Sequence, residues 1–548
     1  MDNYRLILIL SLGIVLFFIY QAWIEDYGAP AQPSPTETIE EVGTVSVPEG
    51  VPESAAPVAR PMAPSTLAAG GSSERIFVET DTLRLEIALE GGALVNAWLK
   101  DYAATADEPD DPFQLLKASP PNMFIAQSGL LGAAGTELPT HKAVFAAAKD
   151  RYELGDAEEL TVELYWEGGD GIQVIKRYHF KRGSYEISAS QEVVNQGDAP
   201  IAMRAYSQLQ RTEYAAKGQS QFIHTYTGGV YYTPEDKYKK VSFSNMEDKK
   251  LDKDAADGWI AMIQHYFMAA WIPPTDRLYT FYTNSLGEGR YIIGMYSPAM
   301  TVAPGSSGEI RERLFVGPKL NETLRSIAPG LELAVDYGWL TVLAQPIFWV
   351  LNKIHSLIGN WGWSIVILTI LIKLAFFKLS ETSYRSMAGM RKITPRIKAL
   401  KDRYGDDKAK LNQAMMDLYK KEKVNPLNGC LPILVQIPVF IALYWVLLES
   451  VELRHASFIF WLNNLSEPDP FYVLPLIMGA SMFLQTKLNP EPPDPIQAKV
   501  MMSLPFVFTV FFAFFPAGLV LYWTVNNILS IAQQWYITRD MEKKEAKK

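Results

Sequence analysis

The feature that most constrains this chain is an apolar run with a lysine inside it. Residues 361–379 read WGWSIVILTILIKLAFFKL, and Lys373 and Lys378 are their only charged residues. As a helix, this run would rise roughly 28 Å, close to the ~30 Å hydrocarbon thickness of a bilayer. We therefore expect it to cross a membrane, with Lys373 about 9 Å from the cytoplasmic end.

Lys373 needs compensation at that depth, because a charged amine there costs at least ~2.5 kcal/mol on insertion scales. One explanation is that its stem lies along the helix and its amine reaches the lipid headgroups, as we expect for Lys378. The other is a water-filled cavity inside the membrane, lined by Lys373 and by Thr369 one turn earlier. The first explanation needs the full reach of the side chain, so the sequence favours the cavity.

The composition fits a chain that is partly membrane-embedded and partly soluble. It has 548 residues, of which 48% are hydrophobic, and a net charge of −9. Charges dominate the middle of the chain, whereas long uncharged runs lie at its N-terminus and in its last third. The acidic balance argues against nucleic acid as the main ligand. The single cysteine, Cys430, excludes a disulfide framework within the chain and a cysteine-based metal site.

The first 27 residues look like an uncleaved transmembrane anchor. Residues 6–24 contain no charge, and only MDNYR precedes them. The alternative is a signal peptide cleaved near residues 29–31, but the run is longer than a usual signal region and Glu25 and Asp26 intervene. Residues 28–73 are rich in Pro, Ala, Ser and Thr, and we expect a flexible tether.

Residues 74–335 have the pattern of an all-β domain. Runs such as RIFVETDTLRLEIAL alternate apolar and polar residues between Gly, Asn and Asp turns, which predicts an antiparallel sandwich. The histidines His141, His179, His224 and His265 show no metal-ligand spacing, and the carboxylates pair only as exposed charges. We therefore expect no metal site and no catalytic centre, and the chain is not expected to be an enzyme.

Residues 336–360 contain an amphipathic helix. Pro346 suits its first turn and Gly359 suits its end. One face is apolar, formed by Ile347, Val350, Leu351, Ile354 and Ile358. We expect this helix to lie in the interface on the outer side of the membrane that the chain spans; the alternative is a packing helix of the soluble domain.

Further apolar runs cover residues 429–448, 471–485, 500–516 and 517–537, with a tight turn expected at Pro516 and Gly518. With the N-terminal anchor and the run around Lys373 they give six spans, five of them within residues 361–537. Lys and Arg accumulate in residues 380–428 and in the basic tail 538–548, which the positive-inside rule places in the cytoplasm. Both termini are then cytoplasmic and the β domain is exported, which in a bacterium means the periplasm.

The basic segment 380–428 predicts a helical hairpin. Apolar residues recur at three and four positions, namely Met387, Met390, Ile393, Ile397, Leu400 and Tyr404, and then Leu411, Met415 and Leu418. Gly405 can end the first helix in a left-handed conformation, and Asp406 or Asp407 can cap the second. Thr394-Pro395 either breaks the first helix or begins a new one.

The charges of this hairpin have two interpretations. They are either a solvated face that also sets topology, or a docking platform for acidic partners or anionic lipid. The candidate docking residues are Arg391, Lys392, Arg396, Lys398, Lys401 and Arg403.

Several motifs in the last two hundred residues resemble the YidC family of membrane protein insertases. They are YKKEKVNPLNGCLPILVQIPVFIALYWVL, VELR, DPFYVLP and FPAGLVLYW. The anchor, tether and β domain resemble the Gram-negative branch, whose periplasmic domain is a β-supersandwich similar to sugar-binding folds. The resemblance implies a polytopic α-helical membrane protein of six transmembrane helices, with an all-β periplasmic domain and a cytoplasmic helical hairpin.

The resemblance also implies a function: inserting and folding nascent inner-membrane proteins through a hydrophilic groove with one positive charge on its floor. That charge is Lys373 here, where most relatives carry arginine, so the bidentate fork is lost. The implied groove residues are Thr369, Gln436, Tyr522 and Trp523, the last in place of a tyrosine, and the implied apolar slide residues are Ile437, Phe440 and Phe511. The implied partners are nascent membrane proteins, the Sec translocon, the ribosome and signal recognition particle pathway, and membrane lipid.

Release of a client into lipid is favoured by burial of its apolar residues, so no nucleotide or other cofactor is expected, and the loops contain no GxxxxGK[ST] motif. Two alternatives stay open at this point. A secondary transporter would also explain a buried lysine, although paired broken helices and intramembrane acids are not found. An exported carbohydrate-binding or carbohydrate-acting protein would explain the β domain alone.

Overall fold

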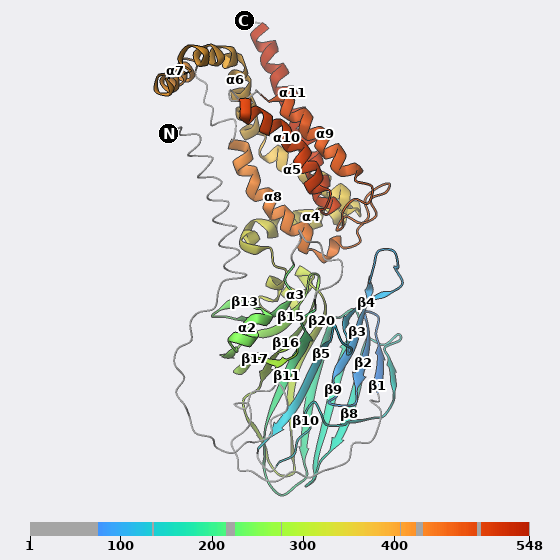
Figure 1. Ribbon diagram of the computed structural model, residues 1–548. Coiled ribbons are helices and arrows are strands. Elements are labelled where there is room, and N and C mark those ends of the chain that lie inside the picture. Colours follow the sequence, from blue (N-terminus) through green and yellow to red (C-terminus); the bar gives the residue numbers. More distant parts are fainter. Residues whose placement is uncertain are drawn as a thin grey trace.

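The computed structural model describes residues 75–133, 136–214, 225–275, 277–405, 407–422, 431–489 and 495–546. The predicted anchor (1–27) and tether (28–73) lie outside these residues, as do His224, Asp406 and Cys430. The described residues form a β domain and a bundle of helices that stands on one end of it (Figure 1).

Two large sheets build the β domain. In the eleven-stranded sheet the order is β14-β17-β18-β11-β5-β3-β2-β1-β7, with β19 beside β11 and β4 beside β3. Its strands are β1 (Arg75–Glu79), β2 (Leu83–Ala88), β3 (Leu94–Ala103), β4 (Pro112–Leu116), β5 (Phe124–Gly132), β7 (Arg151–Glu153), β11 (Ile201–Thr212), β14 (Asp252–Ala255), β17 (Tyr279–Gly287), β18 (Arg290–Tyr296) and β19 (Met300–Val302). Its neighbouring strands are antiparallel except β1 and β7.

The nine-stranded sheet has the order β13-β12-β15-β16-β20-β10-β9-β8-β6 and is antiparallel. Its strands are β6 (Ala146–Ala147), β8 (Glu159–Glu167), β9 (Ile172–Lys181), β10 (Glu186–Asn195), β12 (Gly228–Thr233), β13 (Lys237–Val241), β15 (Trp259–Ile263), β16 (Phe267–Ile272) and β20 (Ser306–Pro318). The prediction of a β-rich domain ahead of a helical part is confirmed.

The alternation seen in the sequence explains this architecture. Along β9, every second residue from Ile172 to Phe180 is buried, and the residues between them are partly exposed, as expected for a strand with one face on a core. The central strands β15 and β16 are buried at every residue, including Trp259 and Trp271, because both of their faces are covered.

A short helix α3 (Asn321–Ile327) leads from the β domain to the amphipathic helix α4 (Thr341–Ile358). Of the predicted apolar face, Ile347, Leu351 and Ile354 are buried, Val350 is half-buried and Ile358 is exposed. Gly359 ends α4 in the left-handed conformation, with φ +72°, and its N–H donates to the carbonyl of His355 at 2.7 Å. The placement of Pro346 in the first turn was wrong, because α4 begins at Thr341 and Pro346 lies inside it.

The apolar run around Lys373 is not one helix. Helix α5 (Trp361–Ala375) ends two residues after Lys373, and α6 (Phe377–Tyr404) begins after Phe376 at an angle of 67°. Among the described residues, this bent pair has the length and hydropathy of a candidate membrane span, and no single helix has. The prediction of a straight helix over residues 361–379 was therefore wrong, and Lys373 lies in the last turn of α5.

The remaining apolar runs form α8 (Leu431–Glu449), α9 (Val473–Leu488), α10 (Pro495–Phe512) and α11 (Ala517–Ala546). The turn between α10 and α11 covers residues 513–516. Gly518 lies in the first turn of α11 rather than in this connection, where its N–H donates to the carbonyl of Leu465 at 2.9 Å. Helix α11 continues well past the predicted end at residue 537.

The predicted basic hairpin is formed by α6 and α7 (Lys408–Lys421). Asp407 caps α7, since its Oδ1 accepts from the N–H of Lys410 at 3.1 Å. The prediction for Gly405 was wrong, because its φ of −52° is right-handed. Pro395 neither breaks α6 nor begins a new helix, and Ile393 and Ile397 beside it are buried.

Candidate functional site

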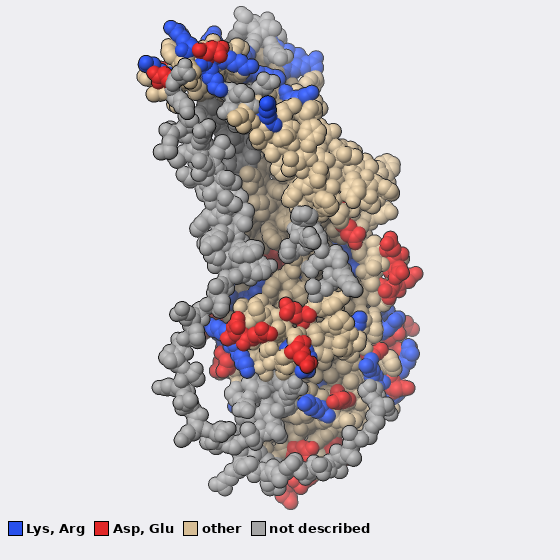
Figure 2. Space-filling model, in the orientation of Figure 1, with Lys and Arg blue, Asp and Glu red and all other residues tan. Residues whose placement is uncertain are grey.

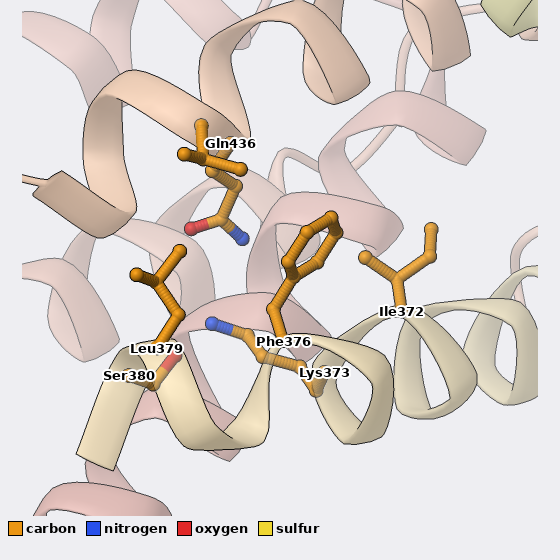
Figure 3. Close-up of a pocket in the computed structure, with 7 residues that line it drawn as sticks. Ile372, Lys373, Phe376, Leu379, Ser380 and Gln436 are labelled. Carbon is orange, nitrogen blue, oxygen red and sulfur yellow. The ribbon is translucent and has the colours of Figure 1, made fainter. Parts of the chain in front are cut away.

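Lys373 and Gln436 face each other across a small pocket. It lies where α5 and α6 meet the first two turns of α8, and it is lined by Ile372, Lys373, Phe376, Leu379, Ser380, Val435 and Gln436. The Lys373 amine and the Gln436 amide project into the same space from opposite helices (Figure 3). Its volume of about 20 Å³ is enough for one water molecule and too small for a peptide.

The amine of Lys373 is held by a neutral partner. Its Nζ donates to Oγ of Ser530 on α11 at 2.7 Å, and this hydroxyl donates in turn to the carbonyl of Asn526 at 2.7 Å. Among the described residues, no carboxylate lies within 4.0 Å of Nζ. The last turn of α5 is also a favourable place for a cation, because helix carbonyls there carry partial negative charge. The positive charge is therefore stabilised but not neutralised.

Gln436 is connected to the same helix. Its Nε2 donates to Oδ1 of Asn526 at 2.5 Å. Asn526 and Ser530 are one turn apart on α11, so both face the α5 and α8 side of that helix. A continuous line of polar side chains thus runs from Gln436 through Asn526 and Ser530 to Lys373.

Asn526 and Ser530 were not among the predicted site residues. The signal was present in LYWTVNNILSIAQQ, where Asn526, Ser530 and Gln533 recur at four and three positions inside an apolar run. Such spacing puts polar groups on one face of a helix, although it does not say which helix they meet.

Thr369 does not line this pocket. It is fully buried, and its hydroxyl donates to the carbonyl of Ile365 within α5 at 2.7 Å. Thr369 is not among the residues that line the pocket around Lys373, and its role in a client groove stays a prediction. The lysine reaches Ser530, which differs from the alternative in which it reaches lipid headgroups.

The predicted aromatic residues meet at a second place on the same helices. The ring of Phe440 on α8 makes an edge contact with Trp523 at 4.5 Å between centroids, and it stacks on Tyr522 at 6.1 Å. Tyr522 is buried and Trp523 is half-buried. These aromatics close the contact between α8 and α11 one turn away from Gln436.

Two of the predicted slide residues are on the surface. Ile437 on α8 is 42% exposed and Phe511 on α10 is 43% exposed. Phe506, Val507 and Val510 on α10 are exposed as well. In a membrane these side chains would face lipid or an apolar client.

The predicted docking residues lie on α6, where Arg391, Lys392, Arg396, Lys398 and Arg403 are exposed and Lys401 is half-buried. Arg396 is engaged within the hairpin, since its Nη1 is 2.5 Å from Oε1 of Glu422. On the face shown in Figure 2, Lys and Arg gather at the end of the helical part far from the β domain. A band without charged side chains separates them from the mixed charges of the β domain.

The β domain contains buried charges that the sequence analysis missed. Lys176 on β9 is fully buried, and its Nζ donates to the carbonyls of Gly91 and Ser128 at 2.7 and 3.0 Å. Burial lowers the pKa of Lys176 to about 7, and burial raises the pKa of the Glu312 carboxyl on β20 to about 7. Lys176 and Glu312 both stand at strand positions whose side chains alternate toward the core, so the period-two pattern could have predicted their burial.

None of these groups forms a recognisable metal or catalytic site. In the described part of the chain, no three His, Cys, Asp or Glu side chains come together as metal ligands. His141 is buried, with Nδ1 2.7 Å from the hydroxyl of Tyr206. The Nε2 atom of His265 lies 2.8 Å from the carbonyl oxygen of Leu448, at the end of α8.

Two family models match adjoining parts of the chain. The one described as YidC periplasmic domain matches residues 75–350, and the one described as 60Kd inner membrane protein matches residues 353–545. The Membrane protein insertase YidC of Nitrosococcus oceani is 51% identical, and that of Thioalkalivibrio sulfidiphilus is 52% identical, each over 99% of both chains. A solved structure described as an active YidC insertase, with its first transmembrane domain resolved, is similar at 17% identity with a TM-score of 0.39, covering 85% of this chain and 93% of that one.

The fold and the matches define an inner-membrane protein whose helical membrane part follows a large periplasmic β domain. The candidate site is a line of polar side chains between apolar helices. The chain belongs to the YidC family of membrane protein insertases, and an insertase is not an enzyme. The predicted function is thus confirmed, and the transporter and carbohydrate alternatives are set aside.

Proposed function

We propose that clients enter the membrane along the polar line formed by Gln436, Asn526, Ser530 and Lys373. The observation that carries this proposal is the Lys373 amine, which is held inside the helical bundle by a neutral hydroxyl alone among the described residues. Two of its three N–H bonds are then available to a client oxygen. A carboxylate about 4 Å away would gain roughly 4 kcal/mol at an effective dielectric constant near 20.

The line provides what a translocating polar flank lacks in lipid. Each unsatisfied backbone group in hydrocarbon costs several kcal/mol. Amide and hydroxyl side chains at successive turns of α11 can replace part of its hydration as it moves. The polar flank would replace its hydrogen bonds to water one by one with hydrogen bonds to Asn526 and Ser530, so it would not be dehydrated in a single step.

The path opens by separation of α8 from α11, because the pocket holds only one water molecule when closed. The Gln436–Asn526 hydrogen bond is the polar contact that must break. A neutral hydrogen bond contributes about 0.5–1.5 kcal/mol, so opening at this point is inexpensive. The contact of Phe440 with Trp523 lies on the same boundary and separates with it.

The apolar part of a client leaves sideways along Ile437 and Phe440 of α8 and Phe511 of α10. The exposure of Ile437 and Phe511 supports this exit. The polar line named above does not include Thr369, whose hydroxyl donates within α5.

We place the basic end of the helical part in the cytoplasm, and both termini with it. The separation of basic residues from the β domain by an uncharged band supports this orientation (Figure 2). With the N-terminal anchor the chain would span the membrane six times. The exposed basic residues of α6 would then receive the ribosome, the signal recognition particle pathway or anionic lipid, and the Sec translocon would be a lateral partner.

The decisive test compares two clients that differ only in their translocated flank, one with aspartates and one with asparagines. Full-length protein in lipid vesicles would carry Lys373→Gln, Lys373→Arg or no change. We expect Lys373→Gln to slow insertion of the aspartate client more than that of the asparagine client, and Lys373→Arg to retain the difference. Equal slowing of both clients would contradict a role for the charge.

A further inference from the structure

The β domain and the helical part are joined by a buried ion pair at the end of α8. Lys319 follows β20, and Glu449 is the last residue of α8. Lys319 Nζ lies 3.1 Å from Oε2 of Glu449, and the two side chains are 2% and 7% exposed. A charged contact this far from water forms only when both elements hold their side chains in place.

Two more contacts surround this pair. Nε2 of His265 lies 2.8 Å from the carbonyl oxygen of Leu448 and must donate, because a carbonyl only accepts. On the other side, Nη2 of Arg454 donates to the carbonyl of Ala104 at 2.9 Å. The Arg454 guanidinium also lies over the rings of Phe113 and Phe267 at 5.5 and 5.4 Å.

These contacts are the kind that a helix end requires. The last carbonyls of a helix have no partners within it, and the C-terminal end favours a nearby cation. For α8 the β domain supplies a hydrogen-bond partner and a cation. His265 lies at the carbonyl of Leu448, and Lys319 lies beside the last turn.

Few side chains of α8 can fix its rotation and depth. Its sequence, LPILVQIPVFIALYWVLLE, is apolar on every side, so rotation about its axis exchanges similar surfaces. Among the described residues, its side chains make polar contacts to other elements at two places: Glu449 with Lys319 at one end, and Gln436 with Asn526 about 20 Å away.

We propose that Lys319 and Glu449 are positioning residues, which fix the depth and rotation of α8 and so bring Gln436 into register with α11. The β domain then holds α8 in the position that the proposed insertion path requires. The effect on insertion rests on the path proposed above, whereas the position of α8 does not. The experiment therefore measures that position directly.

Spin labels at Ile437→Cys on α8 and Leu476→Cys on α9, both exposed positions, would report the distance between the helices in full-length protein in vesicles. Cys430→Ser removes the native thiol. We compare Glu449→Lys, Lys319→Glu and the exchanged pair Lys319→Glu/Glu449→Lys. The matched control is Glu309→Lys, which breaks the pair of Glu309 with Arg311 on the same strand, where the Arg311 side chain is 72% exposed.

We expect one narrow distance in the unchanged protein, in the control and in the exchanged pair. Each single charge reversal should broaden it or add a second distance. Lys319→Met/Glu449→Leu keeps the volume without the charges, so it should remain folded and still lose the single distance. This variant decides the question if the single reversals do not fold.

An unchanged distance in Lys319→Met/Glu449→Leu would overturn the proposal, because packing alone would then position α8. Failure of the exchanged pair to restore the distance in folded protein would overturn it as well. If the distance changes and insertion does not, the positioning stands and the proposed insertion path is wrong.

Discussion

Ser530 offers the sharpest test of how the Lys373 amine works. Its hydroxyl accepts from Nζ at 2.7 Å and donates to the carbonyl of Asn526, so it holds the amine without neutralising it. Ser530→Ala removes this ligand and leaves the charge in place. The lysine side chain then regains rotational freedom, which a client carboxylate must remove when it binds.

The magnitude follows from side-chain entropy. Ordering a lysine side chain costs up to about 1.5–2 kcal/mol. Since about 1.4 kcal/mol is tenfold, Ser530→Ala should slow insertion of an aspartate-flanked client by up to roughly 10- to 30-fold. An asparagine-flanked client should slow less, because its flank gains little from the charge.

The assay is insertion into vesicles measured as protease protection over time, with four proteins: unchanged, Ser530→Ala, Lys373→Gln and the double variant. We expect the effect of Ser530→Ala to be much smaller once Lys373 is replaced, since most of it acts through the amine. Ser530→Thr should retain the unchanged rate. An equal slowing by Ser530→Ala in the Lys373→Gln background would refute the reasoning.

Three other predictions concern stability and the exit. Burial lowers the pKa of His141 to about 4, against about 6.5 when unfolded, so the contribution of His141 to stability is fully present above pH 6.5 and falls by about 1.4 kcal/mol per pH unit between pH 6.5 and 4. The difference in unfolding free energy between the unchanged protein and His141→Gln, compared at pH 7 and pH 5 by denaturant unfolding, measures this contribution. Gly91→Ala should destabilise the β domain far more than Gly183→Ala, although both glycines have positive φ. A Cβ at Gly91 would lie 2.3 Å from the carbonyl oxygen of His141, whereas one at Gly183 would have no atom within 4 Å; thermal unfolding of the two variants compares them. A photocrosslinker at Phe440 or Phe511 should capture a stalled client, whereas one at the exposed Trp349 of α4 should capture lipid; capture of lipid alone from all three positions would count against the exit.

Local patterns predicted much of the fold because it follows local rules. Period-two alternation identified strands such as β9, and apolar runs identified α8, α9 and α11. The break at Phe376 could not be predicted in this way. The sequence LAFFK around it contains no Pro or Gly, so the bend depends on how α5 and α6 pack against α11.

The site was less predictable than the fold. Lys373 and Gln436 were named from the sequence, and both line the pocket. Their partners were missed, because Ser530 is 157 residues from Lys373 along the chain and Asn526 is 90 residues from Gln436. A polar face on a helix can be predicted from spacing, whereas the helix that it meets is a property of the tertiary structure.

The proposed path needs no nucleotide. A client span of twenty leucine-like residues gains about 0.3–0.6 kcal/mol per residue on entering lipid, or roughly 6–12 kcal/mol in all. Against this stands the opening of α8 from α11, where the Gln436–Asn526 bond costs about 0.5–1.5 kcal/mol. The gain exceeds the cost of this hydrogen bond several-fold, so on the proposed path this bond does not decide whether a client enters the membrane. A protein that eases the flank past Lys373 therefore changes the rate of insertion, while the apolar segment itself determines the direction.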